Sequence, residues 1–289
     1  MLAGYDKHNE ITATAMCNLF KKTQDINKVM EAYPGIDYNV ILSIIYSKQL
    51  HFRLEPCQLK INDKKILFIS DTHYGSIYDN MDYANYVFDY AKGNGINTIL
   101  HGGDVLDGGV NSKDGFVPKK EAEYFIENYP FDKDIITHAI LGNHDYMAAY
   151  SSHKVRKILN SRDDIDIMGF KKIYFSWNDS NFGLQHEVKK YRLCFPTFDE
   201  EICFKGHSHY YHTKYFDGKD EVYIPSLSDI PTPCLIDPST HIENKNTLKP
   251  GFIVAEKFDD CIIINHYFFE NKEIIKENEF VKKLTYTSN

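Results

Sequence analysis

From Lys64 onward, short apolar runs alternate with stretches of helical periodicity, and this alternation limits the folds open to the chain. Strand, helix, strand, helix, strand and helix are expected at residues 66–70, 82–92, 98–101, 119–128, 135–141 and 148–159. A βαβαβα order predicts parallel strands joined by right-handed crossovers. The carboxyl ends of these strands should then lie side by side at one edge of a sheet.

Clusters of Asp, Asn and His follow most of the strands expected in this region. They are Asp71-x-His73, Gly103-Asp104-x-x-Asp107, Gly142-Asn143-His144-Asp145, His186 and Gly206-His207-x-His209. Carboxylate, amide and imidazole groups are hard metal ligands, and the glycines beside them allow sharp backbone turns. Several such clusters at successive strand ends are typical of a site that holds two metal ions.

The second half of the chain is richer in strands than the first. Strands are expected at residues 173–177, 182–186, 202–205, 210–216, 221–224, 252–258 and 261–268. Residues 178–181 predict a hairpin turn between the first two of these strands, and Asp259-Asp260 predicts a turn between the last two. The proline-rich residues 226–249 predict a long loop, and such loops are often functional.

The first fifty residues show helical periodicity in three short segments, with Pro34-Gly35 between the second and the third. This pattern predicts a helix-turn-helix-like module at residues 1–50, followed by a linker at 51–63 and a main domain at 64–289. Residues 1–62 carry seven Lys or Arg against six Asp or Glu, so their net charge is only +1. DNA binding through Tyr38, Asn39 and Ser43, and a docking or dimerisation role, both stay open.

Charge and composition narrow the class of protein. A formal net charge of −8 argues against a protein that coats nucleic acid or an anionic membrane through bulk charge. The six cysteines form no CxxC pair, which favours reduced thiols over a disulfide scaffold or a zinc ribbon. No apolar stretch is long enough for a membrane span, and residues 1–10 lack a signal-peptide pattern. We therefore expect a cytoplasmic enzyme.

The motif series DxH, GDxxD, GNHD, a lone His and GHxH, in this order over residues 64–268, resembles that of the calcineurin-like metallophosphoesterase family. The resemblance implies an α/β fold, a four-layer αββα sandwich, with two divalent transition metal ions (Mn, Fe, Zn, Ni or Co). It also implies that a hydroxide shared by the two ions attacks phosphorus in line. By the resemblance, one ion would be held by Asp71, His73, Asp104 and His209, and the other by Asp104, Asn143, His186 and His207.

The resemblance also implies catalytic roles for His144 and Asp107. His144 would lie beside the phosphate without binding metal, and would stabilise the transition state or protonate the leaving oxygen. Asp107 would accept the other ring N–H of His144 and hold its tautomer. Taken alone, Asp71 and Asp107 are equally compatible with helix caps, as is Asp145. The residues expected to be ordinary surface or packing histidines are His101, His138, His153, His212, His241 and His266.

Two positions depart from the family pattern. The lone His of the family is usually followed by Gly, whereas Glu187 follows His186; its position on an expected strand still favours His186 over His153. Gly108 and Asp145 stand where the protein serine/threonine phosphatase branch has Arg and Glu. This difference argues against that branch.

These patterns together predict a metal-dependent phosphoesterase, a hydrolase that acts on ester bonds. We expect phosphodiester, nucleotide or nucleic-acid substrates, because a tethered helical module is suited to an enzyme that acts on nucleic acid. A phosphomonoesterase is the near alternative. From a different class, a DNA-binding regulator or a non-catalytic scaffold would use the same fold, but a scaffold is expected to show a damaged motif, and every motif position here is filled.

Overall fold

The computed structural model describes residues 15–20, 22–23, 26–34, 36, 59–151, 154–170, 172–186, 201–216, 219–230 and 245–284. The chain divides into two compact units, Met1–Leu54 and Glu55–Asn289. In the first unit, residues 15–20 and α2 (Ile26–Ala32) are helical. The third expected helix, which would start near Asp37, lies outside the described residues. The helix-turn-helix module and the expected boundaries at 50 and 64 therefore stay predictions.

A seven-stranded sheet in the second unit has the order β13-β12-β11-β2-β3-β4-β5. Its parallel part consists of β2 (Lys65–Ile69), β3 (Thr98–His101), β4 (Ile136–Leu141) and β5 (Ile165–Phe170). The antiparallel part consists of β11 (Gly251–Lys257), β12 (Cys261–Glu270) and β13 (Glu273–Lys283). The parallel strands neighbour one another in chain order, as the predicted βαβ units require.

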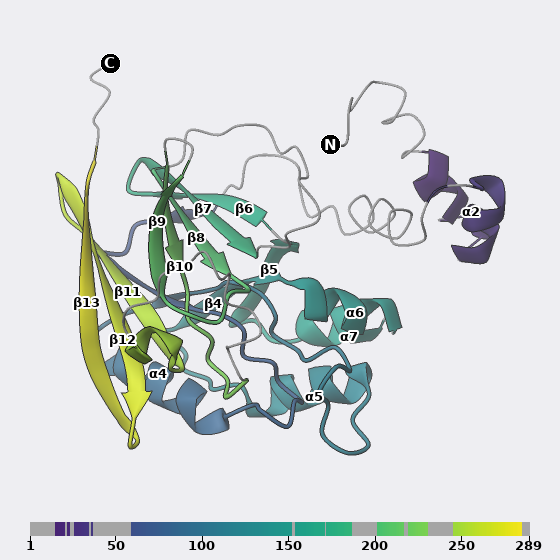
Figure 1. Cartoon of the computed structure of the whole chain (residues 1–289), viewed down its shortest axis with the longest axis horizontal. Helices are drawn as coiled ribbons and strands as arrows, with labels where there is room; N and C mark the ends of the chain where they lie inside the picture. The colour runs from purple at the N-terminus through teal and green to yellow at the C-terminus, as the bar shows by residue number, and fades with distance from the viewer. Residues whose placement is uncertain are drawn as a thin grey trace. The chain divides into compact units, whose positions relative to one another are not determined.

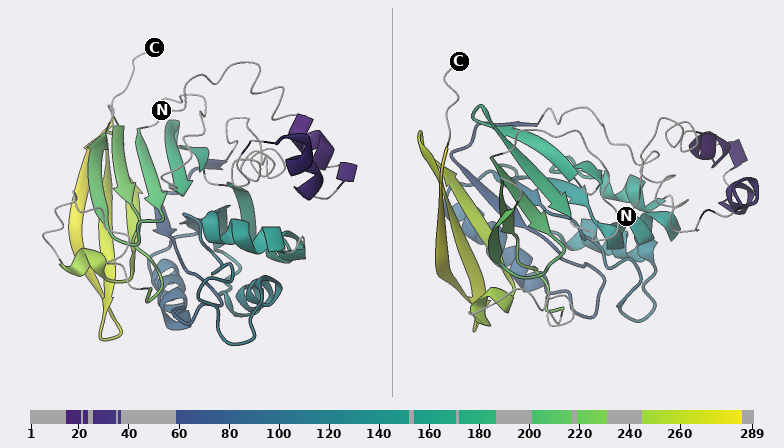
Figure 2. Two further views of the ribbon diagram at one scale, coloured as in Figure 1. Left: turned by 45° about the vertical axis from the view of Figure 1, so that its right-hand side comes forward. Right: turned by 45° about the horizontal axis from the view of Figure 1, so that its top comes forward.

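The helices of this unit connect the parallel strands. They are α4 (Met81–Gly93), α5 (Pro118–Asn128), α6 (Asn143–Ser151) and α7 (Lys154–Leu159). Right-handed crossovers between successive neighbouring strands place all of these helices on the same face of the sheet, and Figures 1 and 2 show them together on one side of it. No helix within the described residues is long and apolar enough to cross a membrane.

A six-stranded sheet packs against the other face of the seven-stranded sheet, with the order β1-β6-β7-β8-β10-β9. Its strands are β1 (Lys60–Ile61), β6 (Lys172–Trp177), β7 (Ser180–His186), β8 (Ile202–Gly206), β9 (His212–Phe216) and β10 (Lys219–Tyr223). The predicted hairpin joins β6 and β7, and its turn residues Asn178 (φ 44°) and Asp179 (φ 67°) are left-handed. Asn and Asp tolerate this conformation better than other side chains.

The main core lies between the two sheets. Phe68 of β2 stacks on Phe204 of β8 with ring centroids 4.0 Å apart, and Phe175, Trp177 and Phe182 complete a buried aromatic layer. Burial of each such side chain contributes on the order of 2–3 kcal/mol to the free energy of folding. The core therefore holds the ends of strands from both sheets in fixed positions.

The α/β fold with two packed sheets and a helical layer is confirmed, and the structure corrects several details. Within the described residues of this unit, the α-helices lie on the seven-stranded sheet. The expected linker contains β1, which pairs with β6 through backbone hydrogen bonds that its sequence does not signal. The sequence interpretation missed β5 and the charged edge strand β13. Charged residues at an edge strand limit pairing with other chains, and they also mask the alternation typical of strands.

Candidate metal centre

The loops after β2, β3 and β4 meet the ends of β7 and β8 from the other sheet. The backbone N–H groups of Asp71 and His73 donate to the carbonyl oxygens of Gly103 (2.9 Å) and Asp104 (3.1 Å), which ties the first two loops together. The backbone N–H of His207, just after β8, donates to Asp71 Oδ2 at 2.9 Å. The structure thus brings all of the predicted ligand loops to one place.

Five of the predicted ligands have left-handed backbone conformations, which are uncommon for residues other than glycine. Their φ angles are 53° for Asp71, 46° for His73, 51° for Asp104, 75° for His207 and 62° for His209. Each such conformation costs on the order of 1–3 kcal/mol and persists only where the surrounding structure enforces it. Strain of this kind is concentrated in functional sites, so it marks these loops independently of their side-chain chemistry.

The first candidate ligand group contains Asp71, His73 and His209, all of them buried. His209 Nε2 lies 3.2 Å from Asp71 Oδ1 and 3.3 Å from His73 Nε2. Burial would raise the pKa of the Asp71 carboxyl, but the neighbouring His209 outweighs it and lowers that pKa. Burial also holds the pKa of His73 well below its ordinary value, so the ring stays neutral, as a metal ligand must be.

The second candidate ligand group contains Asp104, His186 and His207, with the Asn143 side chain beside it. His186 Nδ1 lies 2.8 Å from the carbonyl oxygen of Gly102, which can only accept, so Nδ1 carries the hydrogen. His186 Nε2 then faces two further acceptors, Asp104 Oδ2 at 3.1 Å and Asn143 Oδ1 at 3.0 Å. The Asp104 carboxylate can only accept, so its contact with Nε2 needs either a second proton on His186 or a metal ion between the two atoms.

The pKa values in the second group are shifted in opposite directions. Burial would lower the pKa of His186, but the Asp104 carboxylate raises it to about 9. Burial would likewise raise the pKa of Asp104, and His186 outweighs it, so that pKa lies well below its usual range. Burial lowers the pKa of His207 to about 4. The donor set therefore consists of a carboxylate, an amide oxygen and imidazoles, which fits a divalent transition metal.

Asp104 also forms a group with His73 and His144, so its carboxylate lies between the two ligand sets. Its Oδ1 accepts from the backbone N–H of His144 at 2.8 Å, and its Oδ2 faces His186. Gly142 makes this placement possible, because a Cβ atom there would lie 2.2 Å from Asp104 Oδ1. Any larger residue would displace the central carboxylate.

His144 contacts Asp107 through the main chain of that residue. The His144 ring Nδ1 lies 2.6 Å from the backbone carbonyl oxygen of Asp107, so it donates to the main chain instead of the carboxylate. The Asp107 carboxylate accepts from the backbone N–H of Asn111 at 2.5 Å, because it turns back into its own loop. Asp107 therefore supplies the acceptor for His144 through its backbone, and its catalytic role stays a prediction.

Asp145 fastens two of the ligand loops to each other. Its buried carboxylate accepts from the backbone N–H groups of Val105 (3.1 Å), Leu106 (2.8 Å) and Gly142 (2.8 Å). The bond from Gly142, the residue before α6 (Asn143–Ser151), is a helix-capping contact, and the other two bonds go to the loop after β3. Burial raises the pKa of Asp145 to about 7, against the effect of these three donors.

Sequence reasoning undervalued His101 and Thr72. His101 Nδ1 accepts from the backbone N–H of Gly103 (3.2 Å), and its Nε2 lies 3.1 Å from Thr72 Oγ1. Thr72 Oγ1 in turn donates to the carbonyl oxygen of Val105 at 3.0 Å. The pair therefore links the loops after β2 and β3, and the position of His101 directly before Gly102-Gly103-Asp104 was the available signal. Outside the motifs, Ser226 Oγ donates to the Asp71 carbonyl oxygen at 2.9 Å.

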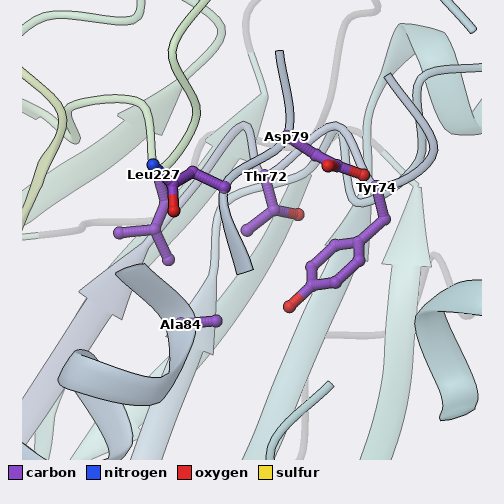
Figure 3. Close-up of a pocket in the computed structure, with 6 residues that line it drawn as sticks. Thr72, Tyr74, Asp79, Ala84 and Leu227 are labelled. Carbon is purple, nitrogen blue, oxygen red and sulfur yellow. The ribbon is translucent and has the colours of Figure 1, made fainter. Parts of the chain in front are cut away.

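A narrow hollow without room for a water molecule lies beside the loop after β2, and Figure 3 shows residues around it. Its lining includes Thr72, Tyr74, Asp79, Ala84 and Leu227, and none of the predicted metal ligands. It is therefore distinct from the metal centre. His153 and residues 187–190, which include Glu187, lie outside the described residues.

Comparisons with known proteins identify the family. Vps29 from Entamoeba histolytica complexed with Zn²⁺ is 16% identical to this chain with a TM-score of 0.42, and the match covers 75% of this chain and 98% of that chain. Vacuolar Protein Sorting 29 from Cryptosporidium parvum is 16% identical with a TM-score of 0.45, and the match covers 76% of this chain and 98% of that chain. An archaeal phosphodiesterase is 16% identical with a TM-score of 0.40, and the match covers 75% of this chain and 99% of that chain. No curated protein matches the chain. The model of the calcineurin-like phosphoesterase family matches residues 64–278, and the chain therefore belongs to that family.

Proposed function

We propose that this protein is a phosphoesterase that hydrolyses phosphate esters with the help of two divalent metal ions. The observation that carries the proposal is the position of the Asp104 carboxylate between two sets of buried ligand atoms. The first ion would be held by Asp71, His73, Asp104 and His209, and the second by Asp104, Asn143, His186 and His207. When bound, such a pair of ions supplies an activated water and stabilises negative charge on the phosphoryl group.

The residues of the chain would divide the remaining work. His144 donates its Nδ1–H to the Asp107 carbonyl oxygen, which leaves Nε2 for proton exchange with the substrate. A protonated Nε2 can stabilise the phosphoryl oxygens or give its proton to the leaving oxygen. The neighbouring Asp104 carboxylate raises the pKa of His144 against the effect of burial, which favours the protonated form needed for these roles.

The tethered helical unit favours phosphodiester or nucleotide substrates, with phosphomonoesters as the alternative. Asn143, His144 and His207 are only half-buried, whereas Asp71, His73, Asp104 and His209 are buried. A substrate would therefore approach from the side of the second ligand set and of His144. DNA binding through residues 1–50 and a cytoplasmic location stay predictions.

The test uses the full chain, stripped with a chelator and reloaded with Mn²⁺. We expect metal-dependent hydrolysis of bis-p-nitrophenyl phosphate that exceeds hydrolysis of p-nitrophenyl phosphate. The reverse order would identify a monoesterase. Asp104→Asn should lower kcat by more than the about 10- to 100-fold typical of losing an outer contact of a metal site.

A matched control for this experiment is His138→Gln. His138 belongs to β4 but pairs with Asp166 near the surface, away from the ligand groups. This variant should keep wild-type turnover, whereas His144→Gln should lower kcat with little change in metal content. Full turnover by the Asp104→Asn variant, or metal binding without hydrolysis of either ester, would contradict the proposal, and the second result would favour a non-catalytic scaffold.

A further inference from the structure

Glu121 is a buried carboxylate outside every motif of the sequence. It belongs to the first turn of α5, and its side chain is inaccessible to solvent. One carboxylate oxygen accepts from the backbone N–H of Gly108 at 2.9 Å, and the other accepts from the N–H of Gly109 at 3.1 Å and from the hydroxyl of Ser112. All three donors belong to residues 107–112, which we call the 107–112 turn.

The 107–112 turn contacts His144 at two points. The carbonyl oxygen of Asp107 accepts from His144 Nδ1 at 2.6 Å, and a Cβ atom on Gly108 would lie 2.2 Å from the His144 carbonyl oxygen. Within the turn, the backbone N–H of Asn111 donates to the Asp107 carboxylate. Two carboxylates therefore shape this turn, Asp107 from within and Glu121 from the neighbouring helix.

Glu121 also touches the loop that follows β2. A Cβ atom on Gly75 would lie 2.5 Å from Glu121 Cγ, so the side chain fills the space that this glycine leaves open. The same loop is bridged to the 107–112 turn, since Ser76 pairs with Ser112 and the N–H of Ile77 donates to the Asn111 carbonyl oxygen at 2.8 Å. Glu121 thus lies where the loops after β2 and β3 join.

We propose that Glu121 is a positioning residue, which holds the 107–112 turn so that the Asp107 carbonyl oxygen keeps the Nδ1–H tautomer of His144. Its kinetic consequence rests on the proposed phosphoesterase function. Gly108 (φ 70°) and Gly109 (φ 86°) have conformational freedom that other residues lack, so this turn needs an external anchor. Without Glu121, the backbone N–H groups of Gly108 and Gly109 lose the acceptor that ties them to α5, and the turn can relax away from His144.

The test compares Glu121→Ala and Glu121→Gln with Glu123→Gln in the full chain. Glu123 lies on the same helix, but its side chain is 40% exposed and pairs with Lys119. We expect Glu121→Ala to lower kcat by about 10- to 100-fold with little change in KM or in metal stoichiometry. Glu121→Gln should fall between this variant and the wild type, because one side-chain oxygen remains as an acceptor. Glu123→Gln should behave as wild type.

A second readout does not depend on turnover. In the Zn²⁺-loaded protein, ¹⁵N NMR of the histidine rings, assigned with His144→Gln, should show protonated Nδ1 on His144 in the wild type and in Glu123→Gln. We expect this signature to be lost or averaged in Glu121→Ala. If that variant does not fold, Glu121→Gln should show the same change to a smaller extent.

Two results separate this inference from the proposed function. If both Glu121 variants keep the wild-type kcat and the wild-type ring signals of His144, Glu121 does not position this residue. If the wild type hydrolyses no phosphate ester, the proposed function fails, and the NMR comparison still decides whether Glu121 holds His144 in place.

Discussion

The Nε2 atoms of His73 and His209 lie 3.3 Å apart in the protein interior, although 136 positions separate the two residues in the chain. Neither Nδ1 atom has a hydrogen-bond partner among the described residues, and the two Nε2 atoms face the space beside Asp71 Oδ1. At most one of the facing nitrogens can carry a hydrogen without conflict. A divalent cation that accepts both lone pairs and the carboxylate removes the conflict and makes all three groups ligands.

Metal removal should therefore destabilise the protein. We expect the chelated form to unfold at a lower temperature, and added Mn²⁺ to restore about 2.7 kcal/mol when the free ion is at roughly 100 times its dissociation constant. Differential scanning calorimetry with and without chelator measures the difference. In Asp71→Asn the gain from added metal should be reduced, whereas in His138→Gln it should be unchanged. An identical gain in Asp71→Asn would place the ion elsewhere.

The metal-free protein should lose stability in mildly alkaline solution because of His186. Asp104 raises the pKa of this ring from 6.5 to about 9 in the folded state. The stabilising His186–Asp104 pair is thus fully present below pH 6.5 and is lost as pH rises through about 9. Urea unfolding of the chelated protein between pH 6 and pH 9 should show this slope, and His186→Gln should remove it. A metal ion competes with the same proton, so metal affinity should rise over this range.

Replacing Asp145 should loosen the ligand loops. Asp145→Ala leaves the N–H groups of Val105, Leu106 and Gly142 without their acceptor, and each unsatisfied buried group costs about 1–3 kcal/mol. We expect the free energy of unfolding in urea to fall by several times the effect of a surface substitution. Asp145→Asn should be milder, because one carbonyl oxygen remains as an acceptor. Equal stability of Asp145→Ala and wild type would show that these three hydrogen bonds are dispensable.

His266 should make the protein sensitive to acid independently of the metal centre. The ring is buried and stacks on Tyr211 with centroids 4.3 Å apart, and within the described part of the chain neither of its nitrogens has a hydrogen-bond partner. Burial lowers its pKa to about 4, so the unfolded chain binds a proton first as pH falls below 6.5. Stability is therefore present above pH 6.5 and is lost progressively toward pH 4, by at most roughly 3 kcal/mol from this residue.

Unfolding curves at pH 7 and pH 4.5 test this prediction. His266→Phe keeps an aromatic ring against Tyr211 and removes the titrating group, so its stability should fall less between the two pH values than that of the wild type. His212→Phe is the comparison, since that ring is less buried and its pKa is lowered to a smaller degree. Equal losses in the wild type and in His266→Phe would rule out a contribution from this ring.

The sequence was sufficient to predict the parallel strands β2, β3 and β4, because each is short, rich in apolar residues and mostly buried. It was insufficient for β13, where Glu and Lys side chains interrupt the alternation, and for β1, whose two residues become a strand only by pairing with β6. It also predicted one helix at residues 148–159 where the structure has α6 and α7. Edge strands and helix breaks depend on what lies beside them, and local periodicity does not contain this information.

By itself, the sequence determined the chemistry of the site: the identity and order of the Asp, Asn and His clusters, and their places after strands. Only the tertiary structure decided which atoms meet. It placed Asp104 between two ligand sets. It also made the backbone carbonyl of Asp107, and not its carboxylate, the partner of His144, and it placed Glu121 of α5 against the 107–112 turn. The reason is physical: residue types and strand periodicity are local properties, whereas hydrogen-bond partners and left-handed loop conformations are set by the packing of two sheets and a helical layer against each other.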